Sequence, residues 1–570
     1  MIQFIIQILT HFILLIRIRI GESLGYRSKD GMLVLAAIVG VLGGAASALF
    51  REANIGLKWL LTGSTDDIVA IAENLSPEMR LLIPTLGGVL GGIMLVLGSR
   101  LFKGMRSQEY LEVIRLGDGV ISIRPTLARL LSSLFAISSG ASIGREGGMV
   151  QLVALVSSSV GRFFNLSRPK LRLLVACGGA AGMASAYNTP LAGALFIAEV
   201  VLQSLAIEAF GPLLVASVMA TLTIRHWIGI NPIFTLPSFT APLEFEFFPV
   251  LGLGILSGFI SPLFLKILDL TKQAFQYLRL PLPISLGLGG FIVGVISVYK
   301  PEVWGNGHAL VELLLSEHPE AGFVLSLLLL KIVATSAAVG SGAVGGVFTP
   351  TLLIGAAVGW LYSNQLHALL PLDTVTYTAL GMGAILSGTS HAPLMAILMI
   401  FEMTMDANLL FPLIVITITA RYISAAIRPQ SIYARALGEI NTKLPYLMLV
   451  SELQVPTKAV VNEDVTAETV SEMFCLSPIQ NIWVVDKSGC YQGCISLQNM
   501  KSFLGDDTLQ HLSASVVFME DDVPTVNSDA ALTDVLVAFA KTTADRLPVV
   551  DGNRMLMGEI SKTDILLTLS

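Results

Sequence analysis

A single charged pair stands inside a small-residue and apolar stretch, SSGASIGREGGMVQL at residues 138–152. Charges are costly in such surroundings, so Arg145 and Glu146 are candidates for a functional site. The small residues before the pair let the backbone leave helical geometry. Residues from Met149 to Val160 predict a new helix. A loop that enters a helix presents unpaired N–H groups at the positive end of the helix dipole, and these groups bind anions.

Glu146 would act as a built-in anion at this helix start. We therefore expect its carboxylate to compete with a transported anion for one pocket, to which Gly144, Arg145 and Gly147 also contribute. The alternative is a glutamate in the first turn of an ordinary helix, stabilised by the dipole. This segment alone does not separate the two interpretations.

The composition indicates an integral membrane protein. Of 570 residues, 54% are hydrophobic and 13% are charged, whereas soluble domains carry about 25% charged residues. The 52 glycines suit close helix packing. The net charge of −6 is too small to indicate a nucleic-acid partner. Four cysteines predict neither a disulfide framework nor a metal site.

The chain divides into three predicted regions. Residues 1–30 contain an apolar run followed by basic residues, which predicts an interfacial or first membrane helix and a cytoplasmic N-terminus. Residues 31–440 contain many apolar segments, several of them shorter than the roughly 20 residues of a bilayer crossing. Helices that stop inside the membrane indicate a cavity lined by protein. The predicted apolar segments are 31–50, 81–100, 125–140, 190–202, 209–225, 248–268, 284–298, 321–340, 347–362, 375–388 and 407–425.

The predicted membrane region repeats itself. Residues 176–200 match residues 380–403, with Pro190 aligned to Pro393 and Glu199 to Glu402, both at an offset of 203. Two related halves with corresponding interrupted segments indicate a transporter-type fold whose site lies between the halves.

The second half supplies a counterpart to the charged loop. GVFTP at 346–350 aligns with GREGG at 144–148 and again opens a helix, for which Thr349-Pro350 is a suitable start. We expect Val347 and Phe348 to offer backbone N–H groups to an anion. The alternative is a simple turn before a membrane helix.

At these motifs the sequence resembles the CLC family of chloride channels and chloride/proton antiporters. GREGG resembles the family's G-[KR]-E-G-P motif, GVFTP matches its G-x-F-x-P motif, and Tyr433 fits the tyrosine at the inner end of its anion site. The resemblance implies an all-α polytopic fold with inverted repeats, at about 31–230 and 248–440. It also implies a homodimer with one pore per subunit, in contact through segments like 190–202, 209–225, 390–405 and 407–425. The short loops and tail indicate a bacterial inner membrane. Glu146 would be the gating glutamate.

Three departures from the family pattern bear on mechanism. Gly148 stands where the family has proline. KGMRSQEYLEV at 103–113 replaces the early G-S-G-I-P motif, so either Met105 or Ser107 would face the anion. Antiporters of the family carry a second acid directly after the glutamate that corresponds to Glu199, and Val200 at that place carries no proton. This favours the bacterial channel-like branch, although Glu199 could still form part of a proton path.

Residues 441–570 resemble a tandem CBS module, a small cytoplasmic α/β domain with predicted units at 452–508 and 512–570. Each unit is expected to contain a strand, a G-x-I-S turn and a helix. The resemblance implies that Ser561, Thr563 and Asp564 bind an adenine nucleotide. A purely structural pair that stabilises the dimer is the alternative.

The sequence therefore predicts chloride transport through a pore gated by Glu146, in contact with membrane lipid and small anions. Because acid protonates a carboxylate, flux should rise as external pH falls, which would suit an electrical shunt during proton export. The first alternative is a proton-coupled anion antiporter. An intramembrane enzyme using Glu146 and His391 lacks any supporting hydrolase motif. A nucleotide sensor on a membrane platform would transport no anion.

Overall fold

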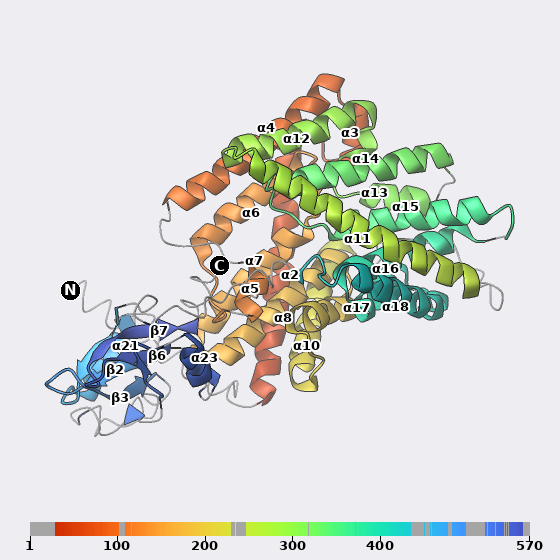
Figure 1. The fold of residues 1–570 in the computed structure, drawn as a ribbon. Coiled ribbons are helices and arrows are strands. Elements are labelled where there is room, and N and C mark those ends of the chain that lie inside the picture. Colours follow the sequence, from red (N-terminus) through yellow and green to blue (C-terminus); the bar gives the residue numbers. More distant parts are fainter. Residues whose placement is uncertain are drawn as a thin grey trace. The chain divides into compact units, whose positions relative to one another are not determined.

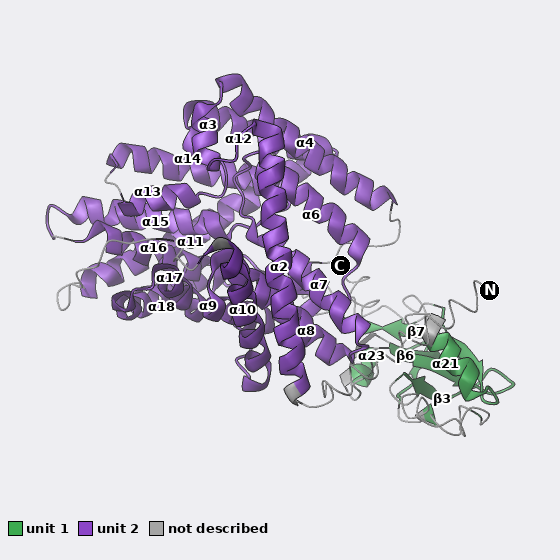
Figure 2. Ribbon diagram, turned by 180° about the vertical axis from the view of Figure 1, so that it is seen from behind, with its two compact units in different colours: residues 1–20, 116–118, 438–570 green, residues 21–115, 119–437 purple. Residues whose placement is uncertain are grey.

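A computed structural model describes residues 29–101, 109–115, 117–229, 234, 247–316, 319–370 and 372–434, and parts of the chain from 450 to 562. The chain forms two compact units. The helical unit comprises residues 21–115 and 119–437, and the C-terminal unit is formed mainly by residues 438–570 (Figure 2). The predicted helix at residues 1–16, Met105 and Ser107 lie outside the described residues.

The helical unit is built from α-helices with short 3₁₀ and π segments (Figure 1). They are α2 Lys29–Thr62, α3 Ile68–Asn74, α4 Pro77–Leu101, α5 Tyr110–Arg115, α6 Ile123–Ser138, α7 Glu146–Phe163, α8 Arg168–Tyr187, α9 Pro190–Leu195, η1 Phe196–Leu202, α10 Ile207–Ile228, α11 Phe247–Tyr277, α12 Leu282–Tyr299, η2 Pro301–Val303, α13 His308–Ser316, α14 Ala321–Gly340, α15 Phe348–Leu366, α16 Thr374–Ser390, α17 Pro393–Thr404, η3 Ala407–Leu409 and α18 Leu410–Ile427.

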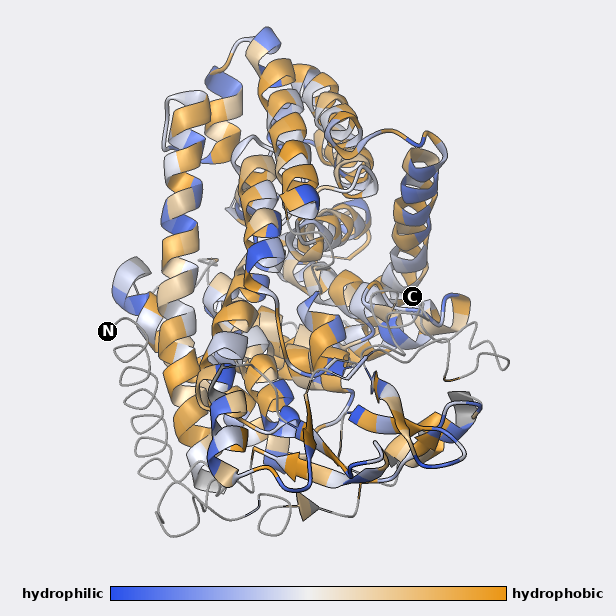
Figure 3. Cartoon of the chain, turned by 90° about the vertical axis from the view of Figure 1, so that its left-hand side faces the viewer, coloured by the Kyte–Doolittle hydropathy of each residue, from blue (hydrophilic) through white to orange (hydrophobic). Residues whose placement is uncertain are grey.

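Seven of the described helices are long and apolar enough to cross a membrane. When the cartoon is coloured by the hydropathy of each residue, apolar residues run along most of the long helices (Figure 3). Glycines let these helices approach closely. In the contact between α4 and α12, a Cβ atom at Gly290 would overlap the carbonyl of Pro84. Shorter helices such as α9 and α17 do not span a bilayer, as the interrupted segments predicted.

The two halves repeat the same local geometry. Helix α8 ends at Tyr187 and α16 at Ser390, and the C-cap residues that follow, Asn188 and His391, are left-handed, with φ of 56° and 60°. Each is followed by an extended residue with φ of −124° and then by a helix that begins with Pro190 or Pro393. Proline suits a first helical position because no N–H partner is needed there.

The C-terminal unit contains two similar sheets. Its elements are β1 Val460–Asn462, α21 Ala467–Leu476, β2 Asn481–Val485, β3 Tyr491–Ser496, β4 Met519–Glu520, β5 Val526–Asn527, α23 Leu532–Ala540, β6 Arg546–Val550 and β7 Leu556–Ser561. Strand β1 pairs parallel with β2, and β2 pairs antiparallel with β3. Strands β5, β6 and β7 repeat this order, with a register shift at the corresponding place.

The prediction that the two G-x-I-S segments form turns is wrong. Gly493–Ser496 lies in β3 and Gly558–Ser561 lies in β7. The buried side chains of Ile495 and Ile560 explain the difference, because each packs into the core of its own unit as part of a strand.

Candidate functional site

Helices α7 and α15 begin opposite each other. Gly144 N–H donates to the Gly346 carbonyl at 2.7 Å, and Gly346 N–H donates to the Gly144 carbonyl at 2.9 Å. This pair is an isolated antiparallel bridge between the two aligned motifs. Gly147 lies against the backbone of Gly346, so a larger residue would crowd this approach. Two helix starts from different halves thus converge.

Helix α7 begins at Glu146, three residues before the predicted start. The Glu146 side chain crosses to the other half of the repeat. Its Oε1 accepts from the backbone N–H of Phe348 at 2.9 Å and of Thr349 at 3.4 Å. The Thr349 hydroxyl donates to Oε2 at 3.4 Å. The carboxylate therefore occupies the N-terminus of α15, where the dipole favours negative charge.

The carboxylate is shielded from solvent within this unit. Glu146 is 5% exposed, and Phe348 and Thr349 are 1% and 3% exposed. Val347 is the N-cap residue of α15, and the amide donors to Glu146 come from the two residues after it. Arg145 is the N-cap residue of α7. Its side chain lines a cavity and makes no hydrogen bond to Glu146 in the described part of the chain.

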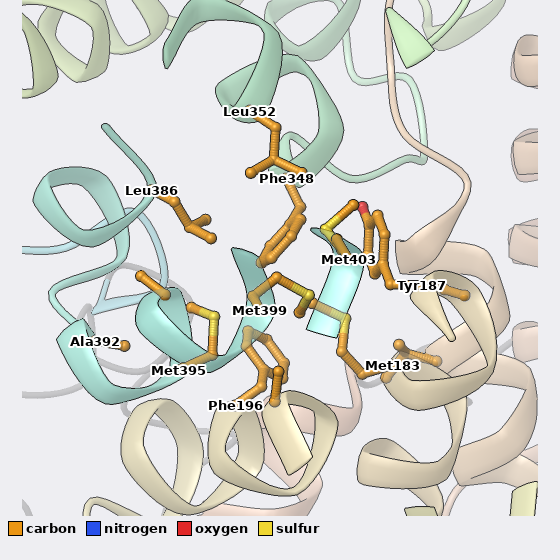
Figure 4. Packing of buried hydrophobic residues seen from close by; sticks show 14 of the residues in the cluster. Met183, Tyr187, Phe196, Phe348, Leu352, Leu386, Ala392, Met395, Met399 and Met403 are labelled. Carbon is orange, nitrogen blue, oxygen red and sulfur yellow. The ribbon is translucent and has the colours of Figure 1, made fainter. Parts of the chain in front are cut away.

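Aromatic rings connect Glu146's partners to Tyr433. Phe348 packs against Tyr187 with ring centroids 4.9 Å apart and against Phe196 at 6.5 Å. Phe196 in turn packs edge-to-face on Tyr433 at 5.3 Å. Methionines surround Phe348 and Phe196 in the close view (Figure 4). Tyr433 therefore lies one ring beyond Phe348, with Phe196 between them.

Two polar residues at this site were not predicted from the sequence. The Tyr187 hydroxyl lies 2.7 Å from Thr349 Oγ1, which in turn reaches Glu146. Thr349 was interpreted only as part of a helix start, and Tyr187 only as part of the repeated segment. Their positions in the sequence could have indicated them. Tyr187 lies in the repeated segment 176–200, and Thr349 follows Phe348 in the aligned motif.

Glu199 lies away from this hydrogen-bonded cluster. Its carboxylate accepts from the N–H groups of Leu394 and Met395 at 3.3 and 2.8 Å, at the start of α17. Glu402 does the same for Leu191 and Ala192 at the start of α9, at 3.0 and 2.8 Å. Each glutamate thus caps the equivalent helix of the other half.

In the C-terminal unit, Ser561 ends β7 and is buried. Thr563 and Asp564 lie outside the described residues, so the structure does not test the predicted nucleotide site.

A family model described as "Voltage gated chloride channel" matches residues 86–425, which include both halves of the site. The chain belongs to the CLC family of voltage-gated chloride channels. A model of the CBS domain matches residues 514–570 of this CLC protein. The first sheet, from β1 to β4, repeats the strand and helix order of that second unit.

Curated relatives of this CLC protein include two named chloride channels. A putative chloride channel protein, ClcB-like, from Ralstonia nicotianae is 45% identical over 414 residues, which cover 71% of this chain and 96% of the relative. The voltage-gated ClC-type chloride channel ClcB of Escherichia coli O81 is 39% identical over 412 residues, covering 70% and 97%.

Solved CLC structures share the fold. A slow cyanobacterial Cl−/H+ antiporter has a TM-score of 0.64 and 26% identity, covering 72% of this chain and 98% of its own. A eukaryotic CLC transporter has a TM-score of 0.65 and 17% identity, covering 94% and 97%. The predicted polytopic helical fold with a C-terminal CBS region is therefore confirmed.

Proposed function

We propose that the protein moves chloride across the membrane through a pathway that the Glu146 carboxylate closes. The observation that carries the proposal is the hydrogen bond from Phe348 N–H to Glu146 Oε1 at 2.9 Å. A carboxylate oxygen takes the amide donors that a bound chloride would use. The named chloride channels among the relatives support chloride as the ion.

Protonation of Glu146 opens the pathway. A neutral carboxyl group loses its attraction to the start of α15, and its side chain can give way to chloride. The helix starts hold the anion without a full opposite charge, each contributing roughly 0.3–2 kcal/mol. Such a shallow site lets the ion leave again. Chloride flux therefore rises as external pH falls, which suits an electrical shunt.

The protein acts as a homodimer with one pore per subunit in the cell inner membrane. Helices α10 and α18 carry exposed apolar side chains that support a contact between copies, among them Leu222, Phe411 and Tyr422. The basic residues after residue 16 support a cytoplasmic N-terminus. The C-terminal unit then lies in the cytoplasm, and Ser561, Thr563 and Asp564 are its candidate residues for an adenine nucleotide. The protein is a transporter and not an enzyme.

A proton-coupled chloride antiporter is the second candidate. The similar cyanobacterial protein of known structure is a Cl−/H+ antiporter, which supports this candidate. Against strict coupling, Val200 follows Glu199, and the Glu199 carboxylate already accepts two backbone hydrogen bonds. Glu199 would have to exchange protons while it caps α17.

The experiment records chloride efflux and proton movement together from liposomes that contain the full-length protein, at two external pH values. The channel proposal predicts faster chloride efflux at the lower pH and no proton movement tied to it. Proton movement in fixed proportion to chloride would establish the antiporter. No chloride efflux at either pH would contradict both and favour a nucleotide sensor.

A further inference from the structure

A cavity of about 420 Å³ lies beside the charged loop, on the side that the Arg145 side chain faces. Four cationic side chains line it but only one acid, Asp67. The cations are Arg51, Lys58, Arg145 and Arg225. They come from α2, from the residue before α7 and from α10, so folding of the helical unit brings them together from distant parts of the sequence.

Two of these cations have no ion pair. The side chains of Arg51 and Arg145 make no hydrogen bond or ion pair among the described residues, and their guanidinium groups repel each other, while the Glu146 carboxylate attracts Arg145. The other two are engaged: Lys58 donates to the Thr65 carbonyl at 3.0 Å, and Arg225 donates to Asn188 at 2.7 Å. Two neighbouring guanidinium groups without an ion pair raise the electrostatic free energy of the folded protein, and an anion bound between them would lower it.

The acid that lines the cavity, Asp67, does not pair with Arg51 or Arg145. The Asp67 carboxylate accepts from the Val69 N–H at 3.0 Å and caps α3. It also faces Lys58. The Glu146 carboxylate attracts Arg145, but its oxygens accept from the start of α15, so among the described residues neither guanidinium group is held in an ion pair.

Polar groups with unused donors complete the lining. Ser185 is 4% exposed, and its buried hydroxyl has no hydrogen-bond partner in the described part of the chain. The side-chain oxygen of Asn54 accepts from the Ser138 hydroxyl at 2.8 Å, and that of Asn306 accepts from the His308 N–H at 3.3 Å. Each of these two amides keeps its nitrogen as a donor.

We propose that this cavity binds a polyatomic oxyanion, such as sulfate or phosphate, between Arg51 and Arg145. The planar fork of a guanidinium group matches two oxygens at once, whereas chloride is spherical and makes no use of the fork. The cavity is also far larger than a single monatomic ion.

Occupancy would slow chloride transport. Arg145 directly precedes Glu146, so an oxyanion on Arg145 would add negative charge beside the proposed chloride path and repel the chloride that enters it. This effect on flux rests on the proposed function, whereas binding itself does not.

Calorimetric titration of sodium sulfate into the full-length protein tests the site, in nanodiscs of phosphatidylcholine at constant ionic strength. We expect Arg51→Gln to weaken sulfate binding by roughly tenfold or more, since a hydrogen bond to a charged group contributes about 1.5–3 kcal/mol. Ser185→Ala should weaken it by a smaller factor without a change of charge. Arg100→Gln removes an exposed arginine outside the cavity and should bind like the wild type.

Absence of sulfate binding, or equal binding by the wild type and both cavity variants, would overturn the proposal. Nanodiscs with added phosphatidylglycerol separate the sources of the ligand. A weaker apparent sulfate affinity there identifies a lipid headgroup as a competitor for the same site, and an unchanged affinity identifies a free oxyanion.

Flux measurements separate the oxyanion site from the proposed chloride transport. External sulfate should slow chloride efflux from wild-type liposomes and act much less on Arg51→Gln. If sulfate binds through Arg51 but no chloride moves, the transport proposal fails and the site remains. If chloride moves but sulfate neither binds nor inhibits, the site fails and the transport proposal remains.

Discussion

Gly144 and Gly346 exchange two backbone hydrogen bonds, which fixes the starts of α7 and α15 against each other. Because neither residue has a side chain, the Glu146 carboxylate can lie directly beside both. A Cβ atom at either glycine would overlap that carboxylate. The space that the carboxylate occupies therefore depends on these two glycines.

Gly346→Ala should displace the Glu146 carboxylate and leave the fold intact, because the atoms that must move are at the end of a flexible side chain. We expect faster chloride efflux at neutral pH and a weaker response to acid. Gly56→Ala is the matched control, since a Cβ there meets no atom within 4 Å. Wild-type gating in Gly346→Ala would refute this account of the glycines.

Tyr187→Phe tests the hydroxyl chain to the gate. The Tyr187 hydroxyl lies 2.7 Å from Thr349 Oγ1, which donates to Glu146. Its loss weakens the support for the ionised carboxylate, so acid activation should begin about 0.5 pH unit higher, which corresponds to about 0.7 kcal/mol. Flux measured over a pH series gives the midpoint. Tyr362→Phe also loses a hydroxyl hydrogen bond, to the Pro249 carbonyl, and should not shift it.

Glu402→Ala and Glu199→Ala should destabilise the helical unit by similar amounts, because each removes the cap of a helix in the other half. We expect a loss of about 1–3 kcal/mol for each. The fraction that stays monodisperse after heating measures this effect, with the exposed Glu78→Ala as control. If Glu199 also carries protons, Glu199→Gln but not Glu402→Gln will change the response of the reversal potential to a proton gradient.

Tyr433→Phe separates two roles of the tyrosine. The ring packs on Phe196, and phenylalanine keeps that contact. If the hydroxyl donates to the inner anion, the variant binds chloride more weakly in calorimetry while flux continues. Unchanged affinity, as expected for the exposed Tyr422→Phe, would make Tyr433 an ordinary interfacial tyrosine.

Much of the helical unit could be predicted from hydropathy and internal repetition. The match of residues 176–200 to 380–403 corresponds to the shared geometry at Asn188 and His391. The same alignment placed Glu146 opposite Phe348, a contact across 202 positions that no local pattern contains.

The remaining contacts depend on tertiary packing. The Tyr187 hydroxyl reaches Thr349 only because α8 ends beside the start of α15. Arg51 of α2 and Arg145, the residue before α7, line one cavity although 94 positions separate them in the sequence. The resemblance to a CBS module predicts turns at the G-x-I-S segments, whereas burial of their isoleucines keeps these segments in strands.

The central claim concerns Glu146 itself, and Glu146→Gln tests it most directly. Chloride efflux from liposomes is measured from neutral to acidic external pH for the wild type, Glu146→Gln and the exposed control Glu78→Gln. The account predicts that the wild type and Glu78→Gln are activated by acid, while Glu146→Gln conducts at every pH. Acid activation of Glu146→Gln equal to that of the wild type would contradict it.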